Sequence, residues 1–303
     1  MITIMAFSIT RARQAYKFIM SEPASRRPAD SRYPARICRT LDIAGYATDL
    51  YKTTSRQTDK LPDYPFKLTD FERQMPFRKS SVRIYLSLIP YFFAAVYFLK
   101  DKVTHGRALA SMRALVDANN GLFRDYPAHY LFDRQEEKLT FWRPDDLLLR
   151  WSYTFDLGNN VFPSQHVSFS VFCALALYHS GYRRSGNFLL LWSLLFSASI
   201  LPVKQHFQAD LVAGLVLATK VLRENHLKPE NPMGADGIRR EAAKLYQNLL
   251  SGNYSPEPEA KQDLIKEIDP QVIKSMENFR RLNPFDGIYA DIIEDTLALI
   301  RRL

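Results

Sequence analysis

The sequence predicts an all-α protein: a membrane-associated helical bundle with a basic N-terminal leader and a helical cytosolic C-terminal tail. Three observations carry this prediction. Most long apolar runs lie between Ser80 and Leu222, and both ends of the 303-residue chain are polar. The mean hydropathy is only −0.23 although 47% of residues are hydrophobic, so the apolar residues must be clustered. We therefore expect a leader over residues 1–64, a core over 65–225 and a tail over 226–303.

The leader is expected to lie in solvent or near an interface. Prolines break helices, and Pro23, Pro28 and Pro34 are spread among its basic residues. Those basic residues are Arg26, Arg27, Arg32, Arg36 and Arg39. The first residues, MITIMAFSITRAR, place the apolar stretch before the charges, and no small-residue cleavage site follows. That order differs from a secretory signal, so we expect this end to be retained.

The first apolar run of the core, residues 84–99, lies between Arg83 and Lys100. It is close to the lower limit for a membrane helix, which needs roughly 17 to 25 residues. The next segment, 106–132, has apolar residues at helical spacing but also Arg113 and Asp117. We expect a helix here whose charges make contact with lipid costly.

Three further apolar segments follow in close succession, over residues 167–177, 188–203 and 211–222. The connections after the first and the third are basic, and basic loops favour the cytoplasmic side of a membrane. This rule places residues 162–166 and 204–210 together on the opposite, extracytoplasmic face. Four basic residues upstream would then lie on that outer face, against the rule: Arg73, Arg78, Lys79 and Arg83.

The tail is expected to be cytoplasmic and helical. Residues 238–250 have the spacing of an amphipathic helix, and the prolines in residues 255–258 interrupt the pattern before further helical sequence.

The formal net charge of +9 is compatible with nucleic acid, an anionic membrane surface or an anionic substrate. Nucleic acid is disfavoured, because the basic residues flank apolar runs instead of forming one stripe with exposed aromatics. With only Cys38 and Cys173, the chain has neither a disulfide framework nor a cysteine metal cluster. No carboxylate cluster or His-x-x-x-His pair is evident, so we expect no metal and no cofactor.

Two short stretches carry the candidate chemistry: residues 162–166 and residues 204–210, each with a histidine at the start of an apolar helix. Helix starts offer unpaired N–H groups and a partial positive charge, so Ser164 and the amides after it can hold a phosphate. His206 and Asp210 are four residues apart, hence on one helical face, where the carboxylate can orient the imidazole for attack. Either stretch alone is more often a packing feature, but their joint occurrence favours a site. The remaining histidines are expected to be surface or packing residues: His105, His129, His179 and His226.

These residues resemble the type 2 phosphatidic acid phosphatase superfamily, which includes vanadium haloperoxidases and sphingolipid phosphotransferases. Its second motif, P-S-x-H, is matched by residues 163–166. Its third motif, S-R-x5-H-x3-D, is matched by Ser199, His206 and Asp210, with Ile200 in place of the arginine. Residues 204–207, Lys-Gln-His-Phe, look like the variant found in inositol-phosphorylceramide synthases and related bacterial phosphatases, in which Lys204 would supply the missing charge.

The first motif, K-x6-R-P, is matched only in part. Arg143 and Pro144 fit its end, Glu136 stands where the lysine is expected, and the nearby Lys138 could substitute. The resemblance covers about residues 64–222.

The resemblance implies a metal-independent lipid phosphate phosphatase. His206 would form a phosphohistidine, oriented by Asp210, and His166 would protonate the leaving oxygen and then activate water. The expected phosphate-binding residues are Ser164, Gln165, Lys204, Arg143 and Lys138. Three alternatives remain open: phosphotransfer from one lipid to an alcohol, a non-catalytic membrane scaffold of the same fold, and vanadium-dependent halide oxidation. The expected partners are a lipid phosphate and a membrane.

Overall fold

The computed structural model describes residues 32–88, 91–92, 94–95, 99, 101–129, 138–155 and 158–250. These residues form helices and no strand, which confirms the all-α prediction. Within them, no helix combines the length and the apolar character that crossing a membrane requires. Membrane association therefore stays a prediction.

The central layer of the bundle is α6 (Lys102–Asp125). Asp101 caps its start by accepting a hydrogen bond from the Thr104 N–H at 2.6 Å. One face of α6 packs into the core through Leu115 and Leu122, both fully buried. The predicted helix over residues 106–132 is thus present, ending at Asp125.

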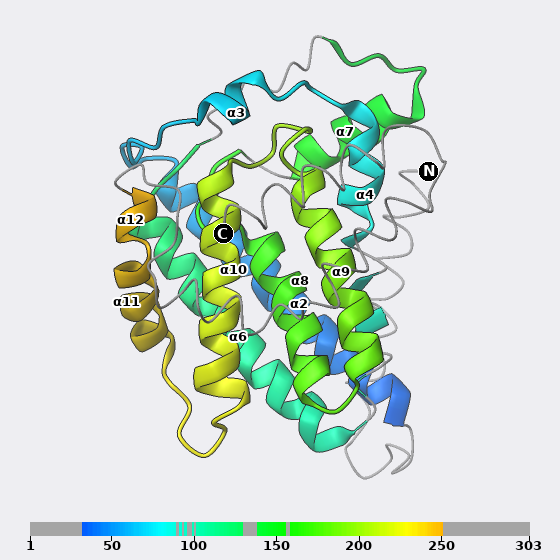
Figure 1. The fold of residues 1–303 in the computed structure, drawn as a ribbon, viewed down its shortest axis with the longest axis vertical. Coiled ribbons are helices and arrows are strands. Elements are labelled where there is room, and N and C mark those ends of the chain that lie inside the picture. Colours follow the sequence, from blue (N-terminus) through cyan, green and yellow to red (C-terminus); the bar gives the residue numbers. More distant parts are fainter. Residues whose placement is uncertain are drawn as a thin grey trace.

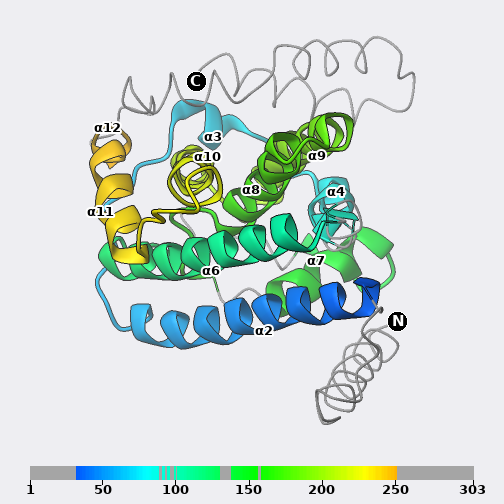
Figure 2. The same ribbon diagram turned by 90° about the horizontal axis from the view of Figure 1, so that it is seen from below.

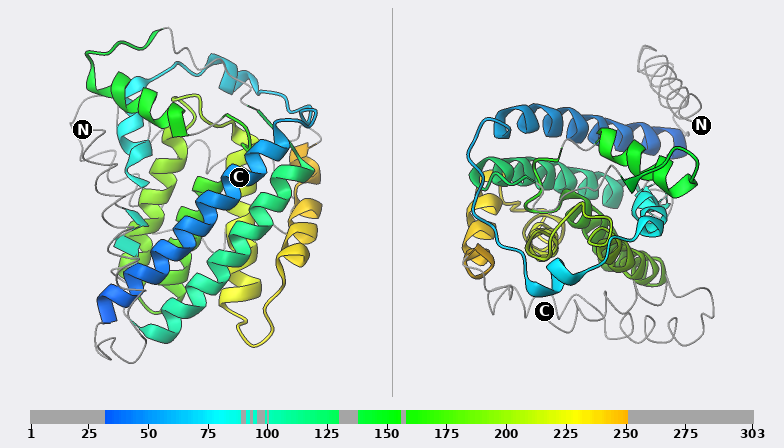
Figure 3. Two further views of the ribbon diagram at one scale, coloured as in Figure 1. Left: turned by 180° about the vertical axis from the view of Figure 1, so that it is seen from behind. Right: turned by 90° about the horizontal axis from the view of Figure 1, so that it is seen from above.

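The outer layer is α2 (Arg32–Thr58), which runs beside α6 at the back of the bundle (Figures 2 and 3). It lies over two of the charged residues of α6: Asp117 accepts a hydrogen bond from Tyr46, and the Arg113 guanidinium lies 4.2 Å from the Tyr46 ring centroid. Two of the charges that would be costly against lipid are therefore in contact with α2, although Arg113 stays exposed.

The prediction of broken helix throughout the leader is wrong for residues 32–58. Pro34 lies in the first turn of α2, where its missing N–H removes no helical hydrogen bond. No proline follows until Pro62, so the helix continues unbroken to Thr58. The earlier prolines of the leader lie outside the described residues.

The three apolar segments predicted after residue 166 form α8 (Gln165–His179), α9 (Arg183–Ser199) and α10 (Gln208–Val221), at the front of the bundle in Figure 1. A tight turn at Gly181, whose φ is +90°, reverses the chain between α8 and α9. Helix α10 continues into a single π-helical turn, η4 (Leu222–His226). Helix α4 (Val82–Leu86), which begins the apolar run predicted over residues 84–99, lies beside α9, and α7 (Pro144–Phe155) packs against α4.

The start of the predicted tail packs onto the bundle as α11 (Ala235–Leu245) and α12 (Gln247–Leu250), which confirms a helix near residues 238–250. Ile238 and Ala242 are fully buried on the bundle side. The Tyr246 hydroxyl donates to the Ala213 carbonyl of α10 at 2.9 Å. The break predicted at residues 255–258 and the helices beyond it lie outside the described residues.

A strap formed by residues 59–81 crosses the end of the bundle at which α10 begins (Figures 1 and 3). It contains α3 (Asp70–Gln74) and the short 3₁₀ turn η2 (Lys79–Ser81). Phe66 of the strap packs on Phe162 and Phe207, with ring centroids 4.7 Å and 5.0 Å apart. The strap thus lies against both stretches that precede α8 and α10.

Candidate active site

The starts of α8 and α10 lie against each other, as the sequence predicted for residues 162–166 and 204–210. The Ser164 N–H donates to the Asp210 carbonyl at 2.9 Å, which joins the two stretches through their backbones. Gly214 makes this approach possible, because a Cβ atom there would lie 2.8 Å from the Ser164 carbonyl oxygen and 3.1 Å from the Val167 Cβ.

His206 and Asp210 form a buried pair. The His206 Nδ1 lies 2.7 Å from the Asp210 Oδ2, which also accepts the Phe207 N–H at 3.3 Å. When the carboxylate is ionised, Nδ1 carries the proton and donates it to Asp210. The other ring nitrogen, Nε2, then has its lone pair available for attack.

The His206 Nε2 faces two groups at the start of α8. The Ser164 Oγ is 3.5 Å away and the His166 Nδ1 is 3.4 Å away. Ser164 also caps α8, because its Oγ accepts the Val167 N–H at 3.4 Å. The Nε2 lone pair therefore points to the place where a helix start, a hydroxyl and a second imidazole meet, which is a setting suited to a phosphate group.

His166 is half-buried and is bounded by aromatic rings. Its ring is edge-on to Tyr85 of α4 and to Phe196 of α9, with centroids 5.7 Å and 6.4 Å apart. It is also nearly perpendicular to the His206 ring, at 82°. Gln165, the first residue of α8, is half-buried next to it.

Burial dominates the ionisation of Asp210. It raises the pKa of this carboxyl to about 6, although the pairing with His206 lowers the pKa. The Glu72 carboxylate also raises it through like-charge repulsion. Among the described residues, no donor reaches the Asp210 Oδ1. Asp210 is thus ionised only above about pH 6, at a cost to the folded state.

Lys204 immediately precedes this pair and has a left-handed backbone, with φ of +59°. Its buried ammonium donates to the Met75 carbonyl at 2.7 Å and to the Glu72 carbonyl at 3.3 Å. Burial lowers its pKa. The Lys204 ammonium was predicted to bind the phosphate, but in the structure it contacts backbone carbonyls at the end of α3.

The two residues predicted from the first motif lie elsewhere. Lys138 and Arg143 are both exposed, in the loop that leads into α7. That loop is fixed by Asp146, which accepts from the Thr140 N–H at 2.7 Å and pairs with Lys79 at 2.9 Å. The structure thus brings together Ser164, His166, His206 and Asp210, and leaves Lys138 and Arg143 on the surface.

Sequence reasoning missed Glu72, which is fully buried beside the site. One of its carboxylate oxygens accepts the Gln208 N–H at the start of α10. A local signal was present: Thr69-x-x-Glu72 is a capping-box pattern. That pattern indicates a helix start, but it does not reveal the distant partner.

Two histidines outside the site, His105 and His226, are buried packing residues, whereas His179 is exposed. Burial lowers the pKa of His105 and of His226 to about 4. His105 contacts Thr40 at 3.2 Å, and His226 contacts Ser180 at 3.2 Å. Within the described ranges, no three His, Cys, Asp or Glu side chains could hold a metal ion together.

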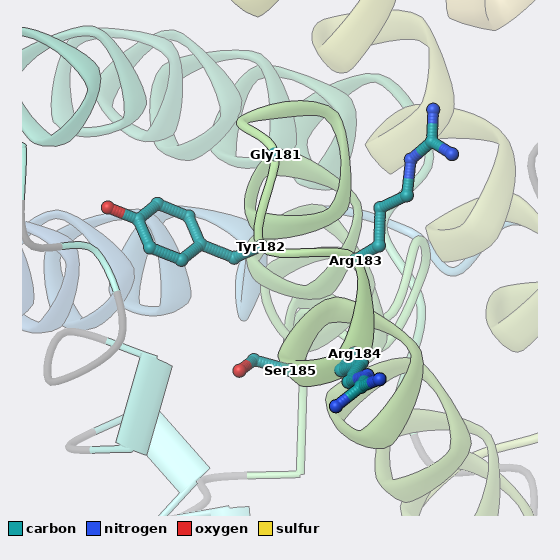
Figure 4. Close-up of a pocket in the computed structure, with 5 residues that line it drawn as sticks. All are labelled: Gly181, Tyr182, Arg183, Arg184 and Ser185. Atoms are coloured by element: carbon teal, nitrogen blue, oxygen red, sulfur yellow. The ribbon is translucent and has the colours of Figure 1, made fainter.

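A surface hollow of about 330 Å³ lies at the turn between α8 and α9. Figure 4 shows its lining residues, among which the Tyr182 and Arg183 side chains point to opposite sides. This turn follows the C-terminal end of α8, whereas His166 lies at the N-terminal end. The hollow is therefore separate from the candidate site.

Residues 136–224 match the model of the PAP2 superfamily. This segment includes Ser164, His166, His206 and Asp210, and it excludes the strap that contains Glu72. No curated protein and no solved structure matches the chain. Over the matched segment the chain is similar to the PAP2 superfamily, which indicates an enzyme of the phosphatase or phosphotransferase kind.

Proposed function

We propose that this protein is a metal-independent phosphatase that acts on lipid phosphate esters through a phosphohistidine at His206. One observation carries the proposal: His206 is held by Asp210 through Nδ1, while its Nε2 faces Ser164 and His166 at 3.5 Å and 3.4 Å. A nucleophile, the group that orients it and a second acid–base group are the elements that covalent catalysis needs.

In the first step the His206 Nε2 attacks phosphorus. The N–P bond forms, the bond from phosphorus to the ester oxygen breaks, and His166 in its imidazolium form gives its proton to that oxygen. The alcohol leaves. The positive charge that His206 gains is balanced by Asp210, which accepts the Nδ1–H.

In the second step water attacks the phosphohistidine. The neutral His166 accepts a proton from the water, the N–P bond breaks, and its electron pair returns to the His206 Nε2. Inorganic phosphate leaves and both histidines regain their initial states. The Ser164 hydroxyl and the first amides of α8, including that of Gln165, bind the phosphoryl oxygens throughout, at a helix start that favours negative charge.

A phosphate cannot enter while the two histidines remain in contact. The His206 Nε2 must lie about 3–3.5 Å from phosphorus, and the His166 nitrogen about 2.6–3.2 Å from the ester oxygen one P–O bond further on, so the facing nitrogens must be more than about 6 Å apart. They are now 3.4 Å apart. Substrate binding therefore separates the rings, and His166, which is half-buried at the start of α8, has more room to move than the buried His206.

The lipid part of the proposal is supported by the loop before α7. Phe141 and Trp142 expose 67% and 92% of their surface there, next to the exposed cations Lys138 and Arg143. Exposed aromatic rings beside basic residues favour the interface of an anionic membrane. In this proposal Lys138 and Arg143 attract phosphorylated lipid to the protein surface.

The test is phosphate release from phosphatidic acid in mixed detergent micelles, with EDTA present throughout. We expect turnover by the wild type and none by His206→Ala. The matched control is His179→Ala, at the opposite end of α8 and exposed, which should retain wild-type turnover. Turnover by His206→Ala close to that of the control refutes the nucleophile. Adding an acceptor alcohol and analysing the lipid products separates hydrolysis from transfer.

A further inference from the structure

The two oxygens of the buried Glu72 carboxylate accept hydrogen bonds from two different parts of the chain. One oxygen, Oε2, accepts the N–H and the hydroxyl of Thr69, both at 2.6 Å, and the Glu72 N–H donates to the Thr69 Oγ1 at 3.1 Å. This reciprocal capping box fixes the start of α3. The other oxygen, Oε1, accepts the Gln208 N–H, the first amide of α10. One buried carboxylate thus joins two helix starts that are far apart in the sequence.

Lys204 connects the same two regions with the roles reversed: here the side chain precedes α10 and the backbone groups lie at the end of α3. Its ammonium donates to the carbonyls of Met75 and Glu72, which are backbone acceptors at the end of α3. Its own backbone is left-handed, a conformation that a residue with a side chain rarely adopts unless its surroundings require it. Residues 205–207, and His206 among them, therefore lie between two points of attachment to α3.

We propose that Glu72 and Lys204 form a clamp that positions His206 for attack, and that the charge of Glu72 stabilises the positive charge His206 gains when it bonds to phosphorus. This inference rests on the proposed function. Glu72 lies in the strap, outside the segment that matches the PAP2 superfamily, whereas Lys204 lies within that segment.

The charges around His206 explain how Glu72 affects the positive charge on the His206 imidazole. Two carboxylates, Asp210 and Glu72, and two basic side chains, Lys204 and His166, face this region from four different parts of the chain, and His166 is neutral once it has protonated the leaving oxygen. When His206 becomes positive, Asp210 can balance it only if Lys204 has its own counter-charge. Without the Glu72 carboxylate, the buried Lys204 ammonium repels a positive imidazole, and in a buried site such repulsion is weakly screened.

The decisive experiment is an NMR titration of the His206 imidazole in the isotope-labelled full chain, with the signal assigned by its loss in His206→Ala. In Glu72→Gln the pKa of His206 should fall by about one unit, because a neutral amide keeps an oxygen for the Gln208 N–H but removes the charge. The matched control is Asp70→Asn, an exposed carboxylate on the same helix, which should leave the pKa of His206 unchanged.

The reverse perturbation gives the opposite sign. Lys204→Met removes the cation, so the pKa of His206 should rise. If Glu72→Gln fails to fold, this variant still tests the clamp. Adding Lys204→Met to Glu72→Gln should bring the pKa of His206 back toward the wild-type value. The same pKa of His206 in wild type, Glu72→Gln and Lys204→Met would overturn the proposal.

Turnover provides a second readout. Glu72→Gln should lower kcat about tenfold, the rate equivalent of one pKa unit, and change KM less than about twofold. A large rise in KM with an unchanged kcat contradicts a role in the attack. Because the titration does not need turnover, a wild type with no phosphatase activity refutes the proposed function but leaves the clamp open to confirmation or refutation by the pKa of His206.

Discussion

Replacing Asp210 by asparagine should keep or raise the stability of the fold while it lowers the activity. Burial raises the pKa of Asp210 to about 6 from an ordinary value of 3.8. A carboxyl whose pKa is raised on folding holds its proton more tightly in the folded state, so its contribution to stability is lost as pH rises from about 4 to about 6. The cost of ionising it in the folded protein is about 3 kcal/mol.

Asparagine avoids this cost but introduces a smaller one. The asparagine oxygen would keep the contact with His206, so its NH₂ group would take the position of the Asp210 Oδ1, where none of the described residues offers a hydrogen-bond partner. An unpaired buried N–H group costs about 1–3 kcal/mol. At pH 8 we therefore expect Asp210→Asn to be as stable as the wild type or more stable, by about 0–2 kcal/mol.

The activity of this variant should fall steeply in spite of its stability. A neutral amide does not select the tautomer in which the His206 Nδ1 carries the proton, and the corresponding change in a serine protease triad costs about 10⁴-fold in kcat. Stability gained together with activity lost is the expected signature of a carboxylate kept for function.

The assay is urea unfolding of wild type and Asp210→Asn at a series of pH values from 4 to 8. Titrating groups that do not contact Asp210 cancel in the difference between the two proteins, and the titration of its partner His206 is followed separately by NMR. The free energy of unfolding of the variant relative to the wild type should rise by about 2–3 kcal/mol from pH 4 to pH 7. A difference that stays constant with pH, or that decreases, refutes the account of Asp210.

Three further predictions concern the site and its support. The kcat of the wild type should fall as pH decreases below about 6, because Asp210 takes up a proton, and a profile that is flat from pH 5 to 8 in mixed micelles contradicts this. Gly214→Ala places a Cβ 2.8 Å from the Ser164 carbonyl, so it should cost about 1–3 kcal/mol in thermal unfolding and lower turnover at least about tenfold. Gly45→Ala, which meets nothing within 4 Å in α2, is its control and should be slightly stabilising with full activity; equal behaviour of the two variants contradicts the close approach. Phe162→Ala removes a fully buried ring that packs on Phe66 and Phe207, and should lower the free energy of unfolding by about 3–5 kcal/mol; a cost below about 1 kcal/mol would show that this cluster does not support the site.

The sequence predicted the helices of the core well because apolar runs are long and their ends are marked. The segment predicted over residues 167–177 is α8, with Ser164 as its cap, and the segment predicted over 211–222 is α10. The meeting of His166 and His206 was also predicted, because the basic connections after the first and the third apolar segments placed residues 162–166 and 204–210 on one face.

What could not be predicted depends on contacts between distant parts of the chain. Glu72 binds the start of α10 across 136 positions, and only the folded structure reveals that contact. Lys204 and Arg143 were assigned to the phosphate from the types of residue in a motif, yet one contacts α3 and the other is exposed. A motif fixes residue types and spacing, whereas the direction of a long side chain depends on what packs around it.

The central claim is that phosphorus becomes bonded to the His206 Nε2 during turnover. The direct measurement is a rapid quench of the enzyme with phosphatidic acid labelled in its phosphate, followed by mass spectrometry of peptides under alkaline conditions. A phosphate on the peptide that contains His206, absent in His206→Ala and longer-lived in His166→Ala, is the predicted result. Full turnover with no phosphorylated peptide, or with phosphate on another residue, would contradict the mechanism.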